Sequence, residues 1–381
     1  MRVCSPHCGI DPETTSDGET YERELLQHLA GRGMQIDILL ARHKRHPENV
    51  PNWTIHRLPI GRGLRWQVAP FILPPAIRRV HDETAFEILR VHSLRYIGPA
   101  ALIARWRYGL DVPIIAHHHH LDPDWLNPVI ERRVMRAVDK VVVGSEFGRR
   151  QAAAELGVPL TQFEVAYYGV DTRFERRPRS EALVRRYGLE GKAVVLFLGG
   201  LKRRKNLFLL LDIWRAIARE RADARLVIAG SGPLLDLLRR YAAGRGLTDS
   251  VLFTGYVPEE AKVDHYNLAD VLLFPSAMEG FGLSVAEAMS CELPVVVSDR
   301  GSLPEVVADE DGGFLCDPDA PDTFVRRVLL LLSEPMLRRK FGLANRERVD
   351  RLFRWDHCAA ATERIYERVL DDWQKRRAQA R

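Results

Sequence analysis

Short apolar runs rich in β-branched residues alternate with longer amphipathic stretches along nearly the whole chain of 381 residues. This alternation favours parallel strands that helices cover on both faces. It therefore predicts an α/β protein built on doubly wound parallel sheets. The predicted strands lie at residues 1–6, 35–41, 54–60, 86–93, 112–120, 139–145, 163–169, 193–200, 224–232, 251–257, 269–276, 294–299 and 312–317.

The strand and helix pattern restarts after a charged stretch of weak periodicity near residues 170–190. A chain of this length predicts about two domains of roughly 150 residues each. We therefore expect an N-terminal domain over residues 1–175 and a C-terminal domain over residues 190–354, facing a central cleft. The final stretch, residues 355–381, has a helical pattern, and we expect it to pack back on the first domain.

Composition is that of an ordinary globular protein, with 46% hydrophobic and 28% charged residues. The net charge of +5 is too small and too dispersed to indicate a nucleic-acid partner, and no basic-aromatic motif supports one. Five scattered cysteines fit reduced thiols in a cytoplasmic enzyme. No apolar run approaches the roughly 20 residues that span a bilayer, and we expect no secretory signal at the N-terminus.

Two glutamates, Glu279 and Glu287, flank a glycine turn after one predicted strand. Gly280 and Gly282 let the backbone approach a ligand closely, and the N–H groups of the following helix favour an anion such as phosphate. Ser284 and Glu287 also match a capping box, which needs no ligand. Capping leaves Glu279 unexplained, whereas carboxylates that accept hydrogen bonds from sugar hydroxyls explain both. The spacing alone leaves both interpretations open.

A basic run at residues 202–205 follows another predicted strand that ends in Gly199 and Gly200. Such runs are usually solvated surface, but ligands of doubly wound sheets bind in the loops after strands. A Lys or Arg at this place could neutralise a diphosphate, and each charge-assisted contact contributes about 1.5–3 kcal/mol.

Taken together, these motifs resemble the retaining glycosyltransferases of family 4, which have the GT-B fold of two Rossmann-like domains. The family's E-x7-E motif corresponds to EGFGLSVAE at residues 279–287. The stretches VIAGSGP, VLFTGYVP and YNLADVLLFPS occur in the family's order and spacing, and AMSCELPVVVSDRGSLPEVV continues the match. The resemblance covers nearly the whole chain and is most specific over residues 195–318.

The resemblance implies a role for each matching residue. Glu287 would bind the nucleotide ribose, Glu279 would lie beside the donor sugar, and Lys205 would bind the diphosphate. The segment beside the base would be Tyr256 and Val257, and the backbone that holds sugar hydroxyls and phosphate would be Gly280, Phe281, Gly282, Leu283 and Ser284.

This chain departs from the family at one donor-binding position. The family usually has Gly-Arg before the lysine, and this chain has Gly199 and Gly200. The second diphosphate cation must therefore come from elsewhere. Arg204 is our candidate, and Lys202 is the reserve.

Four consecutive histidines, residues 117–120, end a predicted strand of the first half. Strand alternation and the family pattern favour His119 as the histidine near the donor sugar and the acceptor. At most two of the four could share a metal ion, because alternate strand residues point to opposite faces. Cys4 and Cys8 lack a second ligand pair, and two Asp-Pro-Asp sequences, residues 122–124 and 317–319, favour turns. We expect no metal site.

Residues 61–79 combine Trp, Phe and Ile with Arg, which makes this segment a candidate for contact with a membrane surface or a lipid acceptor. Its prolines argue against one long amphipathic helix. Peripheral membrane contact therefore stays open.

The sequence thus predicts a metal-independent, retaining hexosyltransferase that uses no cofactor. It would move a sugar from a UDP- or GDP-sugar to a hydroxyl of a carbohydrate or lipid-linked acceptor, with His119, Lys205 and Glu279 assigned to catalysis. The alternative is a catalytically weak sugar-nucleotide-binding or regulatory protein, because of Gly200. A dinucleotide-dependent oxidoreductase is excluded, because no predicted strand leads into G-x-G-x-x-G.

Overall fold

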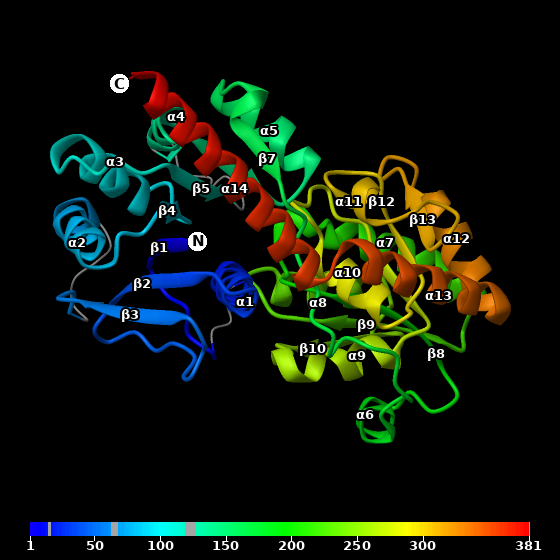
Figure 1. Ribbon diagram of the computed structural model, residues 1–381. Helices are drawn as coiled ribbons and strands as arrows, with labels where there is room; N and C mark the ends of the chain where they lie inside the picture. The colour runs from blue at the N-terminus through cyan, green and yellow to red at the C-terminus, as the bar shows by residue number, and fades with distance from the viewer. Residues whose placement is uncertain (14–16, 62–67, 119–126, 381) are drawn as a thin grey trace. The chain divides into compact units, whose positions relative to one another are not determined.

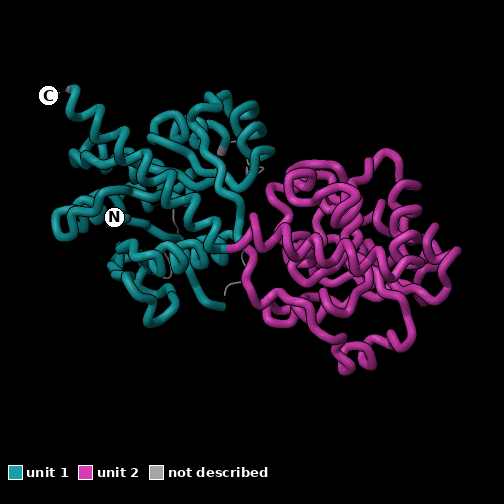
Figure 2. Tube along the Cα trace, turned by 45° about the vertical axis from the view of Figure 1, so that its right-hand side comes forward, with its two compact units in different colours: residues 1–169, 355–381 teal, residues 170–354 magenta. Residues whose placement is uncertain are grey.

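A computed structural model describes residues 1–13, 17–61, 68–118 and 127–380 of the chain. The chain divides into two compact units (Figure 2), which are residues 1–169 with 355–381, and residues 170–354. The charged stretch at residues 170–190 belongs to the second unit, which begins at Val170 rather than after residue 175. It includes the helix α6 (Glu181–Tyr187), which begins after Ser180 as its N-cap.

Unit 1 is built on a parallel sheet, with seven strands in the described ranges, in the order β3-β2-β1-β4-β5-β6-β7 (Figure 1). The strands are β1 (Arg2–His7), β2 (Gln35–Ala41), β3 (Trp53–Leu58), β4 (Ile88–Val91), β5 (Ile114–His118), β6 (Lys140–Val143) and β7 (Phe163–Val165). The helices are α1 (Asp17–Gly31), α2 (Ala69–Thr84), α3 (Ile97–Arg107), α4 (Asn127–Ala137), α5 (Glu146–Leu156) and α14 (Trp355–Ala380), with a short 3₁₀ helix η2 (Leu160–Gln162).

The core of unit 1 lies on both faces of this sheet, because successive strand residues point to opposite faces. On β2, Ile36, Ile38 and Leu40 pack in one cluster with residues of α1 and α14. Leu39 and Ala41 pack in the other cluster, with residues of α2, α3, α4 and α5. The C-terminal helix therefore completes the core of the first unit.

Helix α2 contradicts our interpretation of the prolines in the segment 61–79. It runs from Ala69 to Thr84 with Pro74 and Pro75 inside. Proline in a helix interior removes a backbone hydrogen bond, but α2 buries one face, which includes Leu73, Ile77 and Val80. The burial of that apolar face outweighs the low helix propensity of the two prolines. Residues 62–67 lie outside the described ranges.

Unit 2 also contains a parallel sheet, of six strands in the order β10-β9-β8-β11-β12-β13 over its described residues. The strands are β8 (Ala193–Leu198), β9 (Ala224–Ala229), β10 (Val251–Gly255), β11 (Val271–Phe274), β12 (Val295–Ser298) and β13 (Gly313–Cys316). The helices besides α6 are η3 (Arg203–Lys205), α7 (Leu207–Glu220), α8 (Leu235–Gly244), η4 (Glu259–Ala261), α9 (Lys262–Leu268), α10 (Leu283–Ser290), α11 (Leu303–Val306), α12 (Pro321–Ser333) and α13 (Pro335–Leu352).

Both sheets reverse their strand order beside their first strand. In unit 1, β1 lies between β2 and β4, and in unit 2, β8 lies between β9 and β11. Ligands of doubly wound sheets bind outside the carboxyl ends of the strands at such a switch point. The topology therefore directs attention to the loops after β1 and β4 in unit 1, and after β8 and β11 in unit 2.

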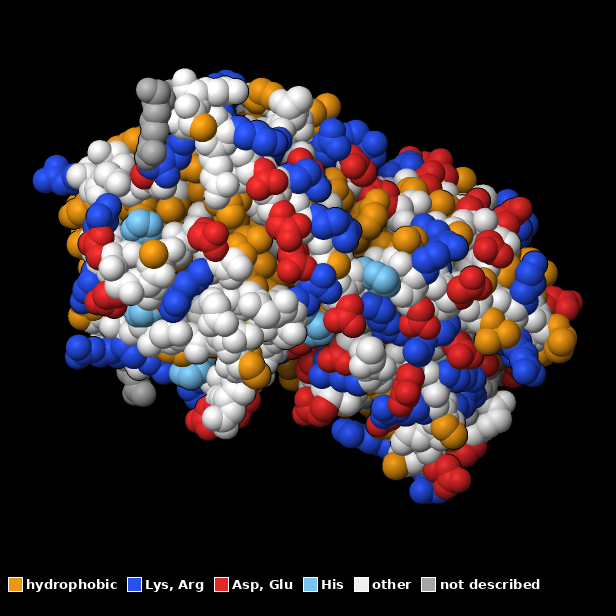
Figure 3. Space-filling view, in the orientation of Figure 1, with side chains coloured by type: hydrophobic (Ala, Val, Ile, Leu, Met, Phe, Trp, Pro, Cys, Tyr) orange, Lys and Arg blue, Asp and Glu red, His pale blue; other side chains and the backbone are white. Residues whose placement is uncertain are grey.

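The predicted α/β fold class is confirmed, and each predicted strand is present. Figure 3 shows Lys and Arg side chains interspersed with Asp and Glu over the face in view, as the dispersed charge of the sequence led us to expect. Within the described ranges, no helix is long and apolar enough to cross a membrane.

Candidate functional site

The switch point of unit 2 brings together two cations and a carboxylate that are more than 70 residues apart in the chain. Lys205 Nζ donates to Glu279 Oε1 at 2.7 Å, and Arg204 Nη1 donates to Glu279 Oε2 at 2.8 Å. Both cations come from η3, after β8, and Glu279 comes from the loop after β11. Ser276 Oγ adds a hydrogen bond to Glu279 Oε1 at 2.6 Å. The structure therefore places Arg204, our candidate for the missing cation, at this carboxylate.

The charge state of Glu279 follows from these contacts. Burial by itself would raise the pKa of this carboxyl, but the charges of Lys205 and Arg204 outweigh burial and hold the pKa below its ordinary value. Lys205 and Glu279 are buried, whereas the side chain of Arg204 is 41% exposed. Solvent therefore reaches one of the two cations directly.

Backbone contacts hold the loop of Glu279 in place. The carbonyl oxygen of Arg204 accepts hydrogen bonds from Ala277 N at 2.8 Å and from Ser276 Oγ at 2.9 Å. Gly301 has φ of 65°, and a Cβ there would lie 2.6 Å from both the backbone N and O of Glu279. Only glycine allows this approach.

Glu287 lies on α10 and has partners of its own. Tyr266 Oη donates to Glu287 Oε2 at 2.6 Å, and Lys262 Nζ lies 3.6 Å from Glu287 Oε1. The capping-box interpretation is wrong, because the N-cap of α10 is Gly282, with φ of 93°, and Ser284 lies inside the helix. The glutamate side chain is thus held by α9 rather than by the helix terminus.

Glycines allow close backbone approach at the ends of β8 and β9. A Cβ on Gly230 would lie 2.0 Å from the carbonyl oxygen of Gly199. A Cβ on Gly200 would lie 3.7 Å from the exposed side chain of Lys202, and the carbonyl oxygen of Gly200 accepts a hydrogen bond from Lys202 N at 2.9 Å. The GSG sequence beginning at Gly230 therefore serves strand-end packing.

The remaining predicted donor residues line the ends of β10 and β11. Tyr256 follows β10 and is 56% exposed, and Val257 is buried. Gly280, Phe281 and Leu283 lie between Glu279 and the first turn of α10, with Phe281 buried. The structure thus brings Lys205, Arg204 and Glu279 into direct contact, and leaves Tyr256 and Val257 on a separate loop.

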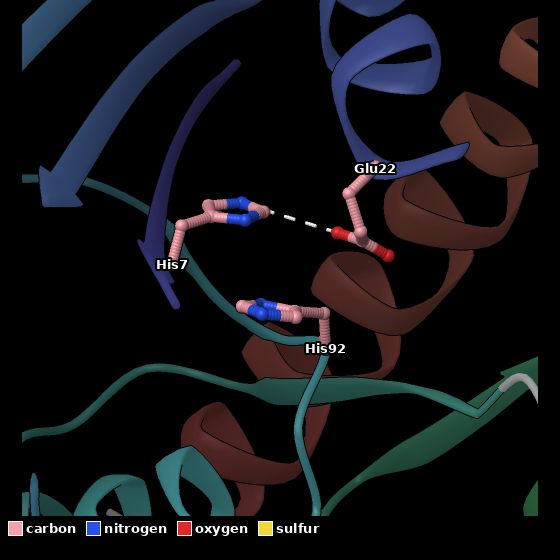
Figure 4. A group of neighbouring side chains, drawn as sticks. All are labelled: His7, Glu22 and His92. Carbon is pink, nitrogen blue, oxygen red and sulfur yellow. Dashed lines mark ion pairs between the residues drawn. The ribbon is translucent and has the colours of Figure 1, made fainter. Parts of the chain in front are cut away.

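The switch point of unit 1 holds a different group, which the sequence analysis missed (Figure 4). His7, at the end of β1, and His92, after β4, stack with ring centroids 4.2 Å apart and planes 11° apart. His7 Nε2 lies 3.9 Å from Glu22 Oε2 of α1. Arg90 binds both carboxylate oxygens of Glu22, at 3.0 Å for Nη2 to Oε1. Arg90, a charged residue inside the otherwise apolar strand β4, was the feature of the sequence that could have indicated this group.

His7, Glu22 and His92 offer three possible metal ligands within 4.8 Å of one another. Two features of this conformation disfavour an ion. Arg90 already neutralises Glu22. The parallel rings also have no common plane, so an ion in the plane of one imidazole lies off the plane of the other.

The histidine run is described only in part. His117 Nε2 and Tyr366 Oη of α14 are 2.8 Å apart, and the two rings pack edge to face. His118 is buried at the end of β5. His119, which we assigned to catalysis, lies outside the described residues, as do His120 and the first Asp-Pro-Asp sequence.

Other predictions of the sequence analysis fall on described residues. The second Asp-Pro-Asp sequence is a turn as predicted, because Asp319 N donates to Asp317 Oδ1 at 3.0 Å, and Arg300 pairs with both carboxylates. All five cysteines lie in the described ranges and are free thiols. Cys4 packs in the core of unit 1.

Comparison with known proteins decides the family. Residues 180–348 match the family model described as Glycosyl transferases group 1, and residues 18–174 match the model described as Glycosyltransferase Family 4. A GDP-mannose-dependent alpha-(1-6)-phosphatidylinositol monomannoside mannosyltransferase of Mycobacterium tuberculosis is 33% identical over 277 residues, which are 69% of this chain and 72% of the relative. The chain belongs to the group 1 glycosyltransferases.

Further similarities extend over nearly the whole glycosyltransferase chain. An N-acetyl-alpha-D-glucosaminyl L-malate synthase of Bacillus anthracis is 26% identical over 357 residues, 92% of this chain and 93% of the relative. The solved structure of a sucrose-phosphate synthase from Thermosynechococcus elongatus superposes with a TM-score of 0.78 at 22% identity, over 97% of this chain and 99% of that one. The predicted GT-B fold is confirmed.

Proposed function

We propose that this glycosyltransferase transfers a hexosyl group, with retention of anomeric configuration, from a nucleoside-diphosphate sugar to an acceptor hydroxyl. One observation carries the proposal. Two cations, Lys205 and Arg204, converge on the buried carboxylate of Glu279 at the switch point of unit 2. Clustered cations make strong charge-assisted hydrogen bonds to a diphosphate, and a carboxylate can accept such bonds from sugar hydroxyls.

The cations would act on the leaving diphosphate. The ammonium of Lys205 has three donors and the guanidinium of Arg204 has five, so each can hold Glu279 and also donate to phosphate oxygens. Negative charge grows on the diphosphate as the bond to the sugar breaks. Donors that are already in position stabilise this charge without reorganisation. Lys205 and Arg204 thus supply the charge that other transferases take from a metal ion, and we propose metal-independent transfer.

Glu279 would orient the sugar rather than attack it. Its lowered pKa keeps it a carboxylate that accepts hydrogen bonds, and two cations reduce its nucleophilicity. We propose that the leaving phosphate takes the acceptor proton, so that both bond changes occur on one face of the sugar. Glu287 would accept from the ribose hydroxyls, and the position of its carboxylate is set by Tyr266.

The relatives indicate which donors and acceptors to test first. One relative is named for GDP-mannose and a phosphatidylinositol mannoside, and the other for L-malate. We propose a GDP- or UDP-sugar as the donor, and a carbohydrate or lipid-linked acceptor in the synthesis of a glycan or glycolipid. We further propose a cytoplasmic location with peripheral membrane contact, in which Phe71 on α2, 81% exposed, would meet the membrane.

The test has two stages. Thermal unfolding is first measured with GDP, UDP and ADP in buffer containing a chelator, and the stabilising diphosphate identifies the donor base. Release of that diphosphate from its sugars is then measured with Lys205→Met and Glu287→Ala. We expect at least about a tenfold loss of turnover in each; for Lys205, removal of one transition-state donor typically costs about 10²–10³-fold.

Two exposed residues of α13 provide matched controls, Lys340→Met and Glu347→Ala. These should keep wild-type turnover, and circular dichroism should show all four variants folded. Wild-type turnover in Lys205→Met or Glu287→Ala would refute the site. Stabilisation by a diphosphate with no release from any sugar would favour the alternative, a catalytically weak sugar-nucleotide-binding or regulatory protein. The position of Arg204 at Glu279 supports turnover instead.

A further inference from the structure

A run of five basic or titratable residues, Arg42, His43, Lys44, Arg45 and His46, follows β2 of unit 1. We call residues 42–46 the basic loop. Because the strands are parallel, this loop lies at the carboxyl edge of the sheet, beside the loop that follows β1. None of the family motifs covers it, and the proposed donor site does not use it.

The basic loop has a defined conformation. Arg57 of β3 donates from Nη1 to the carbonyl oxygen of Lys44 at 2.7 Å, and Lys44 N donates to the carbonyl oxygen of Ala41 at 3.0 Å. Arg42 N donates to the carbonyl oxygen of Leu58 at 3.2 Å. A ligand that binds this loop therefore has little backbone to order, which favours affinity.

The basic loop has three permanently charged side chains, Arg42, Lys44 and Arg45, and Arg45 already forms ion pairs. Arg45 lies 3.0 Å from Asp11 Oδ2 and 2.9 Å from Glu13 Oε2, and so joins the basic loop to the loop after β1. Arg42 is exposed and Lys44 is half-buried, and neither forms an ion pair with a residue in the described ranges. Two cations on an ordered loop are thus available to an anion.

Lys44 lies on the side of the switch point. Its charge acts on Cys8, the residue after β1, where burial raises the pKa of the thiol to about 12 in spite of that charge. It also acts on Asp11, whose pKa is held below its ordinary value by the backbone N–H of Glu13, by Arg45 and by Lys44. Lys44 and Arg45 of the basic loop therefore lie close to the residues that follow β1.

We propose that the basic loop binds the phosphate group of an acceptor, so that the acceptor of this enzyme is a phosphate-bearing alcohol. The inference rests on the proposed function, since it assigns the acceptor class of the same reaction. Arg42 and Lys44 would make charge-assisted hydrogen bonds to the phosphate oxygens, and His43 and His46 flank them. The phosphate can belong to a soluble molecule or to a lipid headgroup.

The experiment uses the full-length protein with its donor site saturated by the nucleoside diphosphate that stabilises it. Soluble probes are inositol 1-phosphate and inositol, titrated calorimetrically. Lipid probes are vesicles of phosphatidylcholine with and without phosphatidylinositol, measured by sedimentation. The double variant Arg42→Gln with Lys44→Gln is compared with Arg132→Gln with Arg133→Gln, which removes two exposed charges from α4 of the same unit.

We expect the wild type to bind inositol 1-phosphate more tightly than inositol, or vesicles that contain the anionic phosphatidylinositol more tightly than vesicles of the zwitterionic phosphatidylcholine alone. The basic-loop variant should bind the preferred probe at least tenfold more weakly, with the affinity for the nucleoside diphosphate unchanged, and the α4 variant should stay within twofold of the wild type. Binding of inositol 1-phosphate would identify a soluble acceptor, and binding only to the vesicles a lipid acceptor.

Two outcomes would overturn the inference. One is equal binding of the preferred probe by the wild type and the basic-loop variant. The other is no preference of the wild type for inositol 1-phosphate over inositol, together with none for vesicles that contain phosphatidylinositol. Release of the diphosphate from its sugar is measured in the same samples. Failure of that release counts against the proposed function, whereas normal release without phosphate binding counts against the acceptor assignment alone.

Discussion

Each unit places a buried glutamate beside an arginine at its switch point, and the two ion pairs differ in their exposure to solvent. In unit 1, Arg90 binds both oxygens of Glu22, and neither side chain is more than 2% exposed. In unit 2, Arg204 binds one oxygen of Glu279, Lys205 binds the other, and the Arg204 side chain is 41% exposed. A closed pair holds elements together, whereas a pair with an exposed cation can exchange partners with a ligand.

The neighbours of each pair support this difference. Beside Glu22 lie His7 and His92, whose stacked rings fill the switch point of unit 1. Glu279 is followed in the chain by a glycine turn and by the first turn of α10, where backbone N–H groups have no partner within the helix. The same strand order therefore yields a structural ion pair in one unit and a candidate binding site in the other. Three experiments test this difference between the two units.

The largest effect on stability is expected from the closed pair. Glu22→Gln or Arg90→Met leaves the partner charge buried without compensation, which costs about 3–5 kcal/mol. The urea midpoint of unit 1, followed by hydrogen exchange of β1 and β4, should fall accordingly. Arg78→Ala breaks an exposed pair with Asp82 on α2 and should cost less than about 1 kcal/mol. If substitution at Glu22 or Arg90 lowers the free energy of unfolding no more than Arg78→Ala does, the buried ion pair does not stabilise unit 1.

A smaller effect is expected from the glycine that supports Glu279. Gly301→Ala places a Cβ 2.6 Å from the Glu279 backbone. At Gly246, which has a similar φ of 71°, no atom of the described residues except its chain neighbours lies within 4 Å of such a Cβ. Both substitutions carry the strain of a left-handed residue, about 1–2 kcal/mol. We expect only Gly301→Ala to weaken binding of the nucleoside diphosphate, by about fivefold or more, because it moves the carboxylate that holds the two cations. Calorimetry measures both variants, and equal affinities would show that the position of Glu279 does not matter.

The smallest effect is a pH dependence of unit 1. Burial, together with the neighbouring His92 and Arg90, holds the pKa of His7 well below 6.5, although Glu22 opposes this. The unfolded chain takes up a proton near pH 6.5 and the folded chain does not. Stability is therefore complete above pH 6.5 and falls below it, by at most about 1.4 kcal/mol per pH unit.

The free energy of unfolding is measured for the wild type and for His7→Phe from pH 7.5 to 5.5. The readout is the difference between the two slopes with pH. His81 and His265 also have lowered pKa values, but their contributions to the slope cancel because both proteins keep these histidines. Glu279 contributes only at lower pH, because its pKa is lowered from 4.5, so that stability is lost as pH falls through that range. An unchanged slope in His7→Phe would mean that His7 titrates normally.

Much of the fold and part of the site could be predicted from the sequence. Strand and helix patterns are local, because a periodicity of two or of 3.6 residues appears within one segment, and every predicted strand was found. Glu279 and the basic run at residues 202–205 could be selected because each follows a predicted strand, where ligands of this fold bind. The choice of Lys205 and Arg204 within that run came from the family resemblance. Their roles in catalysis and binding stay predictions.

The tertiary structure alone decided which of these residues meet. Nothing in the local pattern of Glu287 separates a helix cap from a partner of Tyr266, which lies 21 positions away. Nor does it reveal that His117 meets Tyr366, 249 positions away. Such pairs depend on which strands become neighbours and which helix covers them, and that choice is made by burial of apolar area over the whole chain. The sequence by itself thus determined the elements and the candidate residues, and the tertiary structure decided their partners and their exposure, because partnership is a property of long-range packing.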